Sequence, residues 1–217
     1  MVTPDLHAFV RANLPAPPAR VLEVGAGDGE LARALRGTGY DVFAIDPAPG
    51  GANVRACALH ELDEPPASFD AAVAVVSLHH VDPLAESLRR LATVLVPGAP
   101  VMIDEFDVGA FDTRAAQWWL DQRRALGGDE QATAEELVEE HRHHLHPLDR
   151  ILDALGAHFD FGTPIRGAYL YRWNLGERFR QSEEELTAQA RIPAVGARVI
   201  ARRQPHSRDA LDQLGVG

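Results

Sequence analysis

VLEVGAGDGEL, residues 21–31, is an apolar run that passes through three alternate glycines into a helix-forming segment. Glycine adopts positive φ without strain, and its lack of a Cβ lets a ligand approach the backbone. A helix that follows such a turn presents unpaired N–H groups at its N-terminus. The stretch therefore predicts a strand, a tight turn and a helix that together hold a ligand against bare backbone.

The residue after the third glycine separates two kinds of ligand. A dinucleotide-binding turn has the pattern GxGxxG and places the pyrophosphate at the helix N-terminus. Glu30 stands where the last glycine of that pattern belongs. Its carboxylate would repel a pyrophosphate and its Cβ would obstruct close packing, so NAD and FAD are disfavoured.

A second strand is predicted at residues 41–45, after a helix at about residues 28–38, and it ends at Asp46. In a βαβ unit an acid about 20 residues beyond the glycines accepts hydrogen bonds from ribose hydroxyls. The alternative is that Asp46 and Pro47 only begin a loop, since Asp before Pro is common in turns. The glycine turn and the acid together favour ribose binding.

Two later segments, residues 69–76 and 100–105, have the nearly continuous apolar composition of strands buried on both faces, and a helix is predicted between them at about residues 83–94. Strands that alternate with helices indicate an α/β fold with a mostly parallel sheet and helices on both faces. Ligands of such sheets bind beyond the carboxyl ends of the strands. That edge is expected to gather residues 25–29, Asp46, residues 77–80 and residues 104–107 into one site.

Three motifs resemble those of the class I S-adenosylmethionine (SAM)-dependent methyltransferases, in particular the branch that acts on small molecules. EVGAGDG at residues 23–29 resembles motif I, SFDAAVAVVSLHHV at residues 68–81 resembles motif IV, and LVPGAPVMI at residues 95–103 resembles the turn into the next strand. The resemblance covers about half of the chain. It implies a Rossmann-like fold with a seven-stranded sheet whose last strand is antiparallel, and it implies SAM as cofactor with S-adenosylhomocysteine as product.

The resemblance also implies a set of cofactor-binding residues. One position departs from the family, because Ala58 stands where an acid commonly accepts a hydrogen bond from the adenine amino group. Adenine would then be held by the residues that follow Ala58. The expected cofactor-binding residues are Glu23, Gly25, Ala26, Gly27, Asp46, Pro47, Leu59, His60 and Ser77.

Methyl transfer needs alignment, exclusion of water and, for a hydroxyl or protonated amine acceptor, a base. Histidine is the usual base because its pKa lies near working pH. His79 and His80 directly follow a predicted strand, and His144 lies in the segment where the family inserts substrate-covering elements. These three are the candidate catalytic residues, and the alternative is that they pack around the cofactor or orient a loop.

Histidines recur at residues 141–146, so metal binding is a second possibility for this segment. On a continuous helix His141 and His144 would share a face at i,i+3, as would His143 and His146. Zinc requires three or four ligands, and no second group of partners is evident in the sequence. No metal is therefore expected.

Tyr169, Tyr171 and Arg172 are predicted to line an acceptor pocket, where Arg172 would bind a carboxylate. The alternative is an aromatic core patch with Arg172 in a salt bridge. Beyond residue 106 the sequence predicts helices at about residues 113–126, 132–141 and 147–155, a strand at 159–165, a helix at 177–190 and a final strand at 195–201.

Length and composition limit the remaining possibilities. The chain of 217 residues suits one domain, with an N-terminal helix in residues 1–18, a helical cover at residues 106–155 and a polar tail at residues 204–217. A net charge of −11 argues against nucleic acid or anionic lipid as a partner. No signal peptide or membrane span is evident, which predicts a cytoplasmic protein.

The expected function is methyl transfer from SAM to a small-molecule acceptor. Two alternatives share motif I, namely a SAM-binding protein without transfer activity and a protein methyltransferase. The sequence makes no prediction about the acceptor's identity or the oligomeric state.

Overall fold

The computed structural model describes residues 3–205, and residues 206–217, which hold most of the expected polar tail, lie outside the described part. Eight strands form one sheet in the order β3-β2-β1-β4-β5-β8-β6, with β7 also paired to β8. The strands are β1 (Arg20–Val24), β2 (Asp41–Asp46), β3 (Arg55–Ala56), β4 (Ala71–Val75), β5 (Pro100–Phe106), β6 (Phe159–Phe161), β7 (Ile165–Gly167) and β8 (Gly196–Arg203). The helices are α1 (Pro4–Asn13), α2 (Glu30–Arg36), α3 (Leu84–Val94), α4 (Thr113–Ala125), α5 (Ala134–His144), α6 (Leu148–Leu155) and α7 (Arg180–Ala188). Four 3₁₀ turns complete the set: η1 (Leu59–Glu61), η2 (Leu78–His80), η3 (Leu170–Arg172) and η4 (Glu177–Phe179).

The sheet is mostly parallel, as predicted. Strands β3, β2, β1, β4 and β5 are paired in parallel. The last strand, β8, runs antiparallel to β5, with Met102 opposite Ile200. The Rossmann-like α/β fold expected from the sequence is confirmed.

The strand expected at residues 159–165 is divided into β6 and β7, so eight strands replace the expected seven. Both pieces pair with β8, with Phe161 opposite Ala201 and Ile165 opposite Arg198. The three residues between these two pairs, 162–164, therefore lie opposite only two residues of β8, 199 and 200. Pro164 lies in this interruption, and proline has no N–H to give to the ladder.

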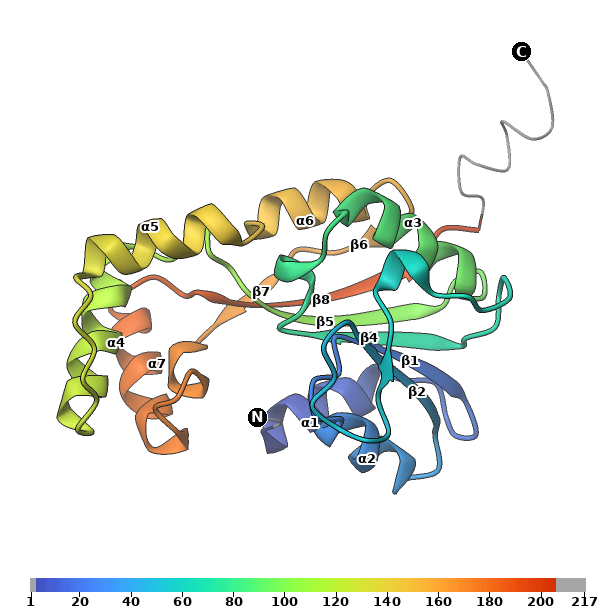
Figure 1. Cartoon of the computed structure of the whole chain (residues 1–217), viewed down its shortest axis with the longest axis horizontal. Helices are drawn as coiled ribbons and strands as arrows, with labels where there is room; N and C mark the ends of the chain where they lie inside the picture. Colours follow the sequence, from blue (N-terminus) through green and yellow to red (C-terminus); the bar gives the residue numbers. More distant parts are fainter. Residues whose placement is uncertain (1–2, 206–217) are drawn as a thin grey trace, which may run out of the picture.

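Helices cover both faces of the sheet (Figure 1). On one face, α1 and α2 bury Leu6, Val10 and Leu35 in an apolar cluster with strand residues. On the other face, α3 and α6 pack together, and α3 buries leucines at a spacing of three or four residues. Apolar side chains of both helices, such as Leu88 and Ile151, join that core.

The second half of the chain adds a separate apolar cluster beyond the carboxyl end of β5. Helices α4 and α5 and the turn η3 contribute to it, together with Phe106 and Phe111. Figure 1 shows α4 and α7 at one end of the molecule, with α5 running from there toward the sheet. Of the cover expected over residues 106–155, α4 and α5 lie beyond the sheet edge, whereas α6 packs on the face of the sheet beside α3.

Candidate active site

The glycine turn between β1 and α2 adopts the conformation that its sequence predicts. Gly25, Gly27 and Gly29 all have positive φ, at 68°, 53° and 73°. A Cβ added to Gly25 would lie 2.3 Å from the Cβ of Ser77, the second residue after β4. The turn therefore packs directly against the end of β4, and no side chain fits at Gly25.

Asp46, at the end of β2, holds this turn in place. Its Oδ2 accepts a hydrogen bond from the Gly27 N–H at 2.9 Å, and its Oδ1 accepts one from the Ala48 N–H at 2.8 Å. A carboxylate oxygen can accept more than one hydrogen bond, so both oxygens retain capacity for a ligand. Asp46 thus joins the turn to a pocket beside it.

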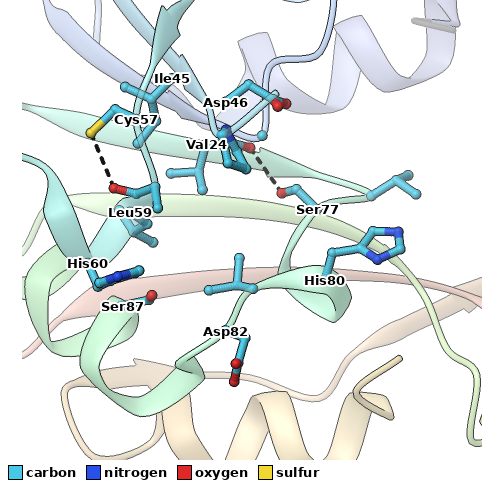
Figure 2. Close-up of a pocket in the computed structure, with 15 residues that line it drawn as sticks. Val24, Ile45, Asp46, Cys57, Leu59, His60, Ser77, His80, Asp82 and Ser87 are labelled. Atoms are coloured by element: carbon cyan, nitrogen blue, oxygen red, sulfur yellow. Dashed lines mark hydrogen bonds between the residues drawn. The ribbon is translucent and has the colours of Figure 1, made fainter. Parts of the chain in front are cut away.

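That pocket, called here the Asp46 pocket, has a volume of about 280 Å³. Figure 2 shows Asp46 and Ser77 at one side of it and His60 and Ser87 at the other. Two buried polar atoms of its lining, Nδ1 of His60 and Oγ of Ser87, have no hydrogen-bond partner among the described residues. The pocket therefore offers carboxylate, imidazole and hydroxyl groups to a ligand.

A second pocket, called the glycine pocket, adjoins the first across Gly25 and Val76, which line both. Its volume is about 350 Å³. Glu23 lines it with a side chain that is only 4% exposed, and its Oε2 has no hydrogen-bond partner among the described residues. Burial raises the pKa of this carboxyl to about 7. A ligand cation would relieve that cost.

A third cavity, called the histidine chamber, has a volume of about 300 Å³ and opens between the loop after β4 and the elements of the second half. Val76 lines this chamber as well as the two pockets, so the three cavities meet there. Its φ of 51° is rare for a β-branched residue, and such strain is typical of functional sites. The chamber is lined by Val76, His79, His80, Phe106, Glu140, His141, His144, Leu145, Tyr169 and Trp173.

Within the chamber wall, His79 is paired with a buried carboxylate. Its Nδ1 donates to Oε2 of Glu105 at 2.5 Å. The other oxygen of Glu105 accepts from the N–H groups of Ser77 and Leu78, at 2.9 and 2.6 Å. Glu105 therefore fixes both the loop and the imidazole, and Nε2 is the ring nitrogen of His79 that remains available as an acceptor.

The other two candidate catalytic histidines also reach this chamber. His80 lines both the chamber and the Asp46 pocket, and its pKa lies below the ordinary value because of partial burial and the neighbouring His79. His144 is exposed at the chamber's α5 side.

The histidine-rich run is helical only as far as His144, three residues beyond the end expected for α5. His141 and His144 both line the chamber, so the prediction that they share a helix face is confirmed. His143 and His146 do not lie on one continuous helix, since α5 ends before His146. His146 instead donates from Nε2 to the Val81 carbonyl at 3.0 Å, which anchors the cover to the loop after β4.

The three residues predicted to bind the acceptor lie close together, with Arg172 over the Tyr169 ring, but they do not all line one cavity. Tyr169 lies between the chamber and the glycine pocket, and its ring stacks on Phe106 with centroids 5.0 Å apart. Tyr171 is buried and lines a different cavity, called the arginine pocket, which lies beside β7 and α7. Arg172 lies between the arginine pocket and the glycine pocket, away from the chamber, and forms a salt bridge with Asp104.

Several site residues escape sequence reasoning. Glu105 carries no local sign of its pairing with His79, because the two lie 26 positions apart on neighbouring strand ends. Phe106 and Trp173 look like ordinary core aromatics until the fold places them beside the histidines. A charged residue inside the buried strand β5 is the one available signal for Glu105.

All the expected cofactor-binding residues line the two adjoining pockets. The Asp46 pocket contains Gly25, Asp46, Pro47, Leu59, His60 and Ser77, and the glycine pocket contains Glu23, Gly25, Ala26 and Gly27.

SAM consists of an adenosine and an amino-acid tail, which need an acid for the ribose, polar partners for the base and an acid for the ammonium group. Asp46, His60 and Glu23 could supply these three groups respectively, the first two from the Asp46 pocket and the third from the glycine pocket. An α/β sheet with this glycine turn, strand-end acid and paired pockets defines a class I SAM-dependent methyltransferase.

Comparison with known proteins assigns the chain to a family. A family model for a methyltransferase domain matches residues 3–156, and the chain belongs to this methyltransferase-domain family. The match includes the glycine turn, Asp46, His79 and Glu105 but ends before Tyr169 and Arg172.

A curated relative is similar over part of its length. A ubiquinone biosynthesis O-methyltransferase of Xanthomonas campestris pv. campestris (strain B100) is 37% identical over 113 residues, which is 44% of this chain and 46% of that protein. The chain thus spans less than half of this relative.

Solved structures match over most of the chain. A SAM-dependent methyltransferase from Mesorhizobium loti has a TM-score of 0.59 at 18% identity and covers 92% of this chain and 97% of that one. Phosphoethanolamine N-methyltransferase 2 of Haemonchus contortus, solved in complex with SAM, has a TM-score of 0.61 at 19% identity over 92% of this chain and 52% of that one. At these identities the likeness shows the fold.

No helix within residues 3–205 is long and apolar enough to cross a membrane. No group of three or more metal-ligating side chains is placed to hold a metal ion within the same residues.

Proposed function

We propose that this chain transfers the methyl group of SAM to a hydroxyl group of a small molecule held in the histidine chamber. One observation carries the proposal: the chamber meets the two cofactor pockets at Val76, so an acceptor there lies beside the junction of adenosine and amino-acid tail. When bound, SAM supplies a methyl group activated by a sulfonium leaving group. The chain must then align the acceptor, exclude water and remove a proton.

His79 is proposed as the group that takes the acceptor's proton. Glu105 accepts from Nδ1, which leaves Nε2 as the basic nitrogen and stabilises the imidazolium that forms after proton transfer. Burial of the pair keeps water from competing for the proton, since His79 is 3% exposed and Glu105 is fully buried.

The chamber lining favours a compact acceptor with a substantial apolar part. Phe106, Tyr169 and Trp173 provide aromatic surface, and the histidines provide a few polar contacts, which is typical of small-molecule sites. The similarity to the Xanthomonas O-methyltransferase supports an oxygen acceptor.

The test measures methyl transfer from labelled SAM to a panel of small hydroxylated aromatic compounds. His79→Gln is expected to lower kcat by about 10²- to 10⁴-fold and to leave the Kd of S-adenosylhomocysteine unchanged. Glu105→Gln is expected to shift the pH profile of kcat, because the imidazolium loses its partner.

A matched control is His143→Gln, since His143 is exposed on α5 and does not line the chamber. Its kcat should equal that of the wild type. Retention of full kcat by His79→Gln would contradict the assignment of the base. Binding of S-adenosylhomocysteine without transfer to any compound would favour a binding protein, and transfer to protein side chains alone would favour a protein methyltransferase.

A further inference from the structure

The glycine pocket has an unusual balance of charge. Among its described lining residues are three acids, Glu23, Asp28 and Glu30, and Arg172 is the one cation. The amino-acid tail of SAM carries a carboxylate as well as an ammonium group. The acids suit the ammonium but repel the carboxylate, so the carboxylate requires a donor of opposite charge.

The glycine turn has few free backbone donors for that carboxylate. The Ala26 N–H donates to the Ile45 carbonyl and the Gly27 N–H donates to Asp46. The Gly29 N–H donates to the Ala26 carbonyl, and the Glu30 N–H donates to the Asp28 side chain. The turn that binds phosphate groups in other proteins is thus largely occupied by its own hydrogen bonds.

Arg172 is held rigidly and still has donors to spare. Its Nη1 donates to Oδ1 of Asp104 at 2.5 Å, and among the described residues this is its only hydrogen-bond acceptor. Nε and Nη2 therefore remain for a ligand. The side chain of Arg172 is only 8% exposed, so its position is well defined.

Arg172 and Arg198 belong to one network of ion pairs. Asp104 is shared, because its Oδ2 accepts from Nε of Arg198 at 2.7 Å. Arg198 itself pairs with Asp5 of α1 at 2.8 Å. Because Arg198 has Asp5 as a second partner, Asp104 stays bonded to Arg172 and holds its guanidinium group beside the glycine pocket.

We propose that Arg172 binds the carboxylate of the cofactor's amino-acid tail, while Glu23 at the same pocket faces the ammonium group. The residue comes from η3, beyond the segment that the family model matches. The second half of the chain therefore contributes to the cofactor site as well as to the acceptor chamber. The proposal concerns the methyl donor and does not depend on the acceptor or its base.

The test compares two ligands by calorimetry: S-adenosylhomocysteine and its decarboxylated analogue, 5′-deoxy-5′-(3-aminopropylthio)adenosine. The wild type is expected to bind S-adenosylhomocysteine more tightly. Arg172→Gln is expected to weaken that binding about 10- to 100-fold, as for loss of a charged hydrogen bond, with less than about threefold change for the analogue. A partly misfolded sample affects both ligands equally, so the ratio of the two Kd values reports the carboxylate contact.

Arg198→Gln is the matched control, since it breaks the same network through Asp104 but does not line the glycine pocket. Its Kd ratio should match that of the wild type. If Arg172→Gln fails to fold, Arg172→Lys is the second variant, because it keeps the charge but loses the planar fork. Its ratio of the analogue's Kd to the Kd of S-adenosylhomocysteine is expected to fall at least about threefold below that of the wild type. An unchanged ratio in the Arg172 variants, or an equal change in Arg198→Gln, overturns the proposal.

Discussion

Gly25 is the residue with the least room for change. Alanine there would carry the cost of a left-handed backbone, about 1–2 kcal/mol, and the clash of its Cβ with Ser77, about 1–3 kcal/mol more. Gly27 is the matched control, because its φ is similar but a Cβ there would meet nothing within 4 Å. Urea unfolding of the two alanine variants should show a clearly larger loss of stability for Gly25→Ala. Equal losses would mean that the turn yields to Ser77 without strain.

Glu23 should make the stability of the ligand-free protein depend on pH. Its carboxyl has an ordinary pKa of 4.5 in the unfolded chain and a pKa of about 7 in the fold, with burial as the main cause. Between these values the folded state binds more protons than the unfolded state, so the free energy of unfolding decreases as pH rises. The free energy of unfolding is therefore highest below pH 4.5 as far as Glu23 is concerned, and it falls by about 3 kcal/mol in all as pH rises through 7.

Glu23→Gln removes this titration. Urea unfolding measures the difference in stability between the variant and the wild type at two pH values. This difference is expected to favour the variant more at pH 8 than at pH 5. Glu86→Gln, at an exposed position of α3, is the control and should show no such gain. A stability difference between wild type and Glu23→Gln that is the same at both pH values would disagree with a buried, titrating Glu23.

At the scale of elements, the first half of the fold could be predicted because its signals are local. The buried strand at residues 71–75 and helix α3 follow directly from apolar runs and spacing. The break at Pro164 shows where such reasoning fails. Residues 159–165 have the composition of one strand, and only the pairing with β8 reveals an extra residue between two pieces.

The site divides in the same way. Asp46 and the glycine turn could be predicted because a single βαβ unit brings them together. The pair of His79 and Glu105 joins the ends of two strands, and Arg172 reaches the glycine pocket from the far half of the chain. Such contacts depend on tertiary packing, which residue spacing does not encode.

The junction between α5 and α6 gives a prediction for a whole element. His146 donates from its backbone N–H to the His79 carbonyl at 2.9 Å and from its ring to the Val81 carbonyl. His146→Ala removes the ring's hydrogen bond, worth about 1 kcal/mol, and should increase amide exchange at residues 141–146 roughly fivefold. His143→Ala, at an exposed position of α5 three residues earlier, is the control. Unchanged exchange in His146→Ala would show that the cover is anchored elsewhere.

At the scale of the whole molecule, the cofactor should act as a clamp, because its pockets draw on both halves of the chain. The Asp46 pocket is built from the ends of β1, β2 and β4, whereas the glycine pocket also includes Tyr169 and Arg172. A ligand that binds only the folded state at 100 times its Kd stabilises it by about 2.7 kcal/mol. For a chain of this size that corresponds to a rise in Tm of roughly 5–10 °C.

Thermal unfolding with and without S-adenosylhomocysteine measures this rise. Asp46→Ala should remove most of it, since the ribose loses its carboxylate partner. Asp41→Ala changes an exposed acid at the opposite end of the same strand and should keep the full rise. Asp46 also supports Gly27 and Ala48, so the ligand-free Tm of Asp46→Ala is expected to fall, and the ligand-induced difference is the relevant quantity. A full rise in Tm for Asp46→Ala would mean that Asp46 does not bind the cofactor. The glycine pocket would then have to supply the affinity, so the effect of Arg172→Gln on the same rise in Tm would become the decisive comparison.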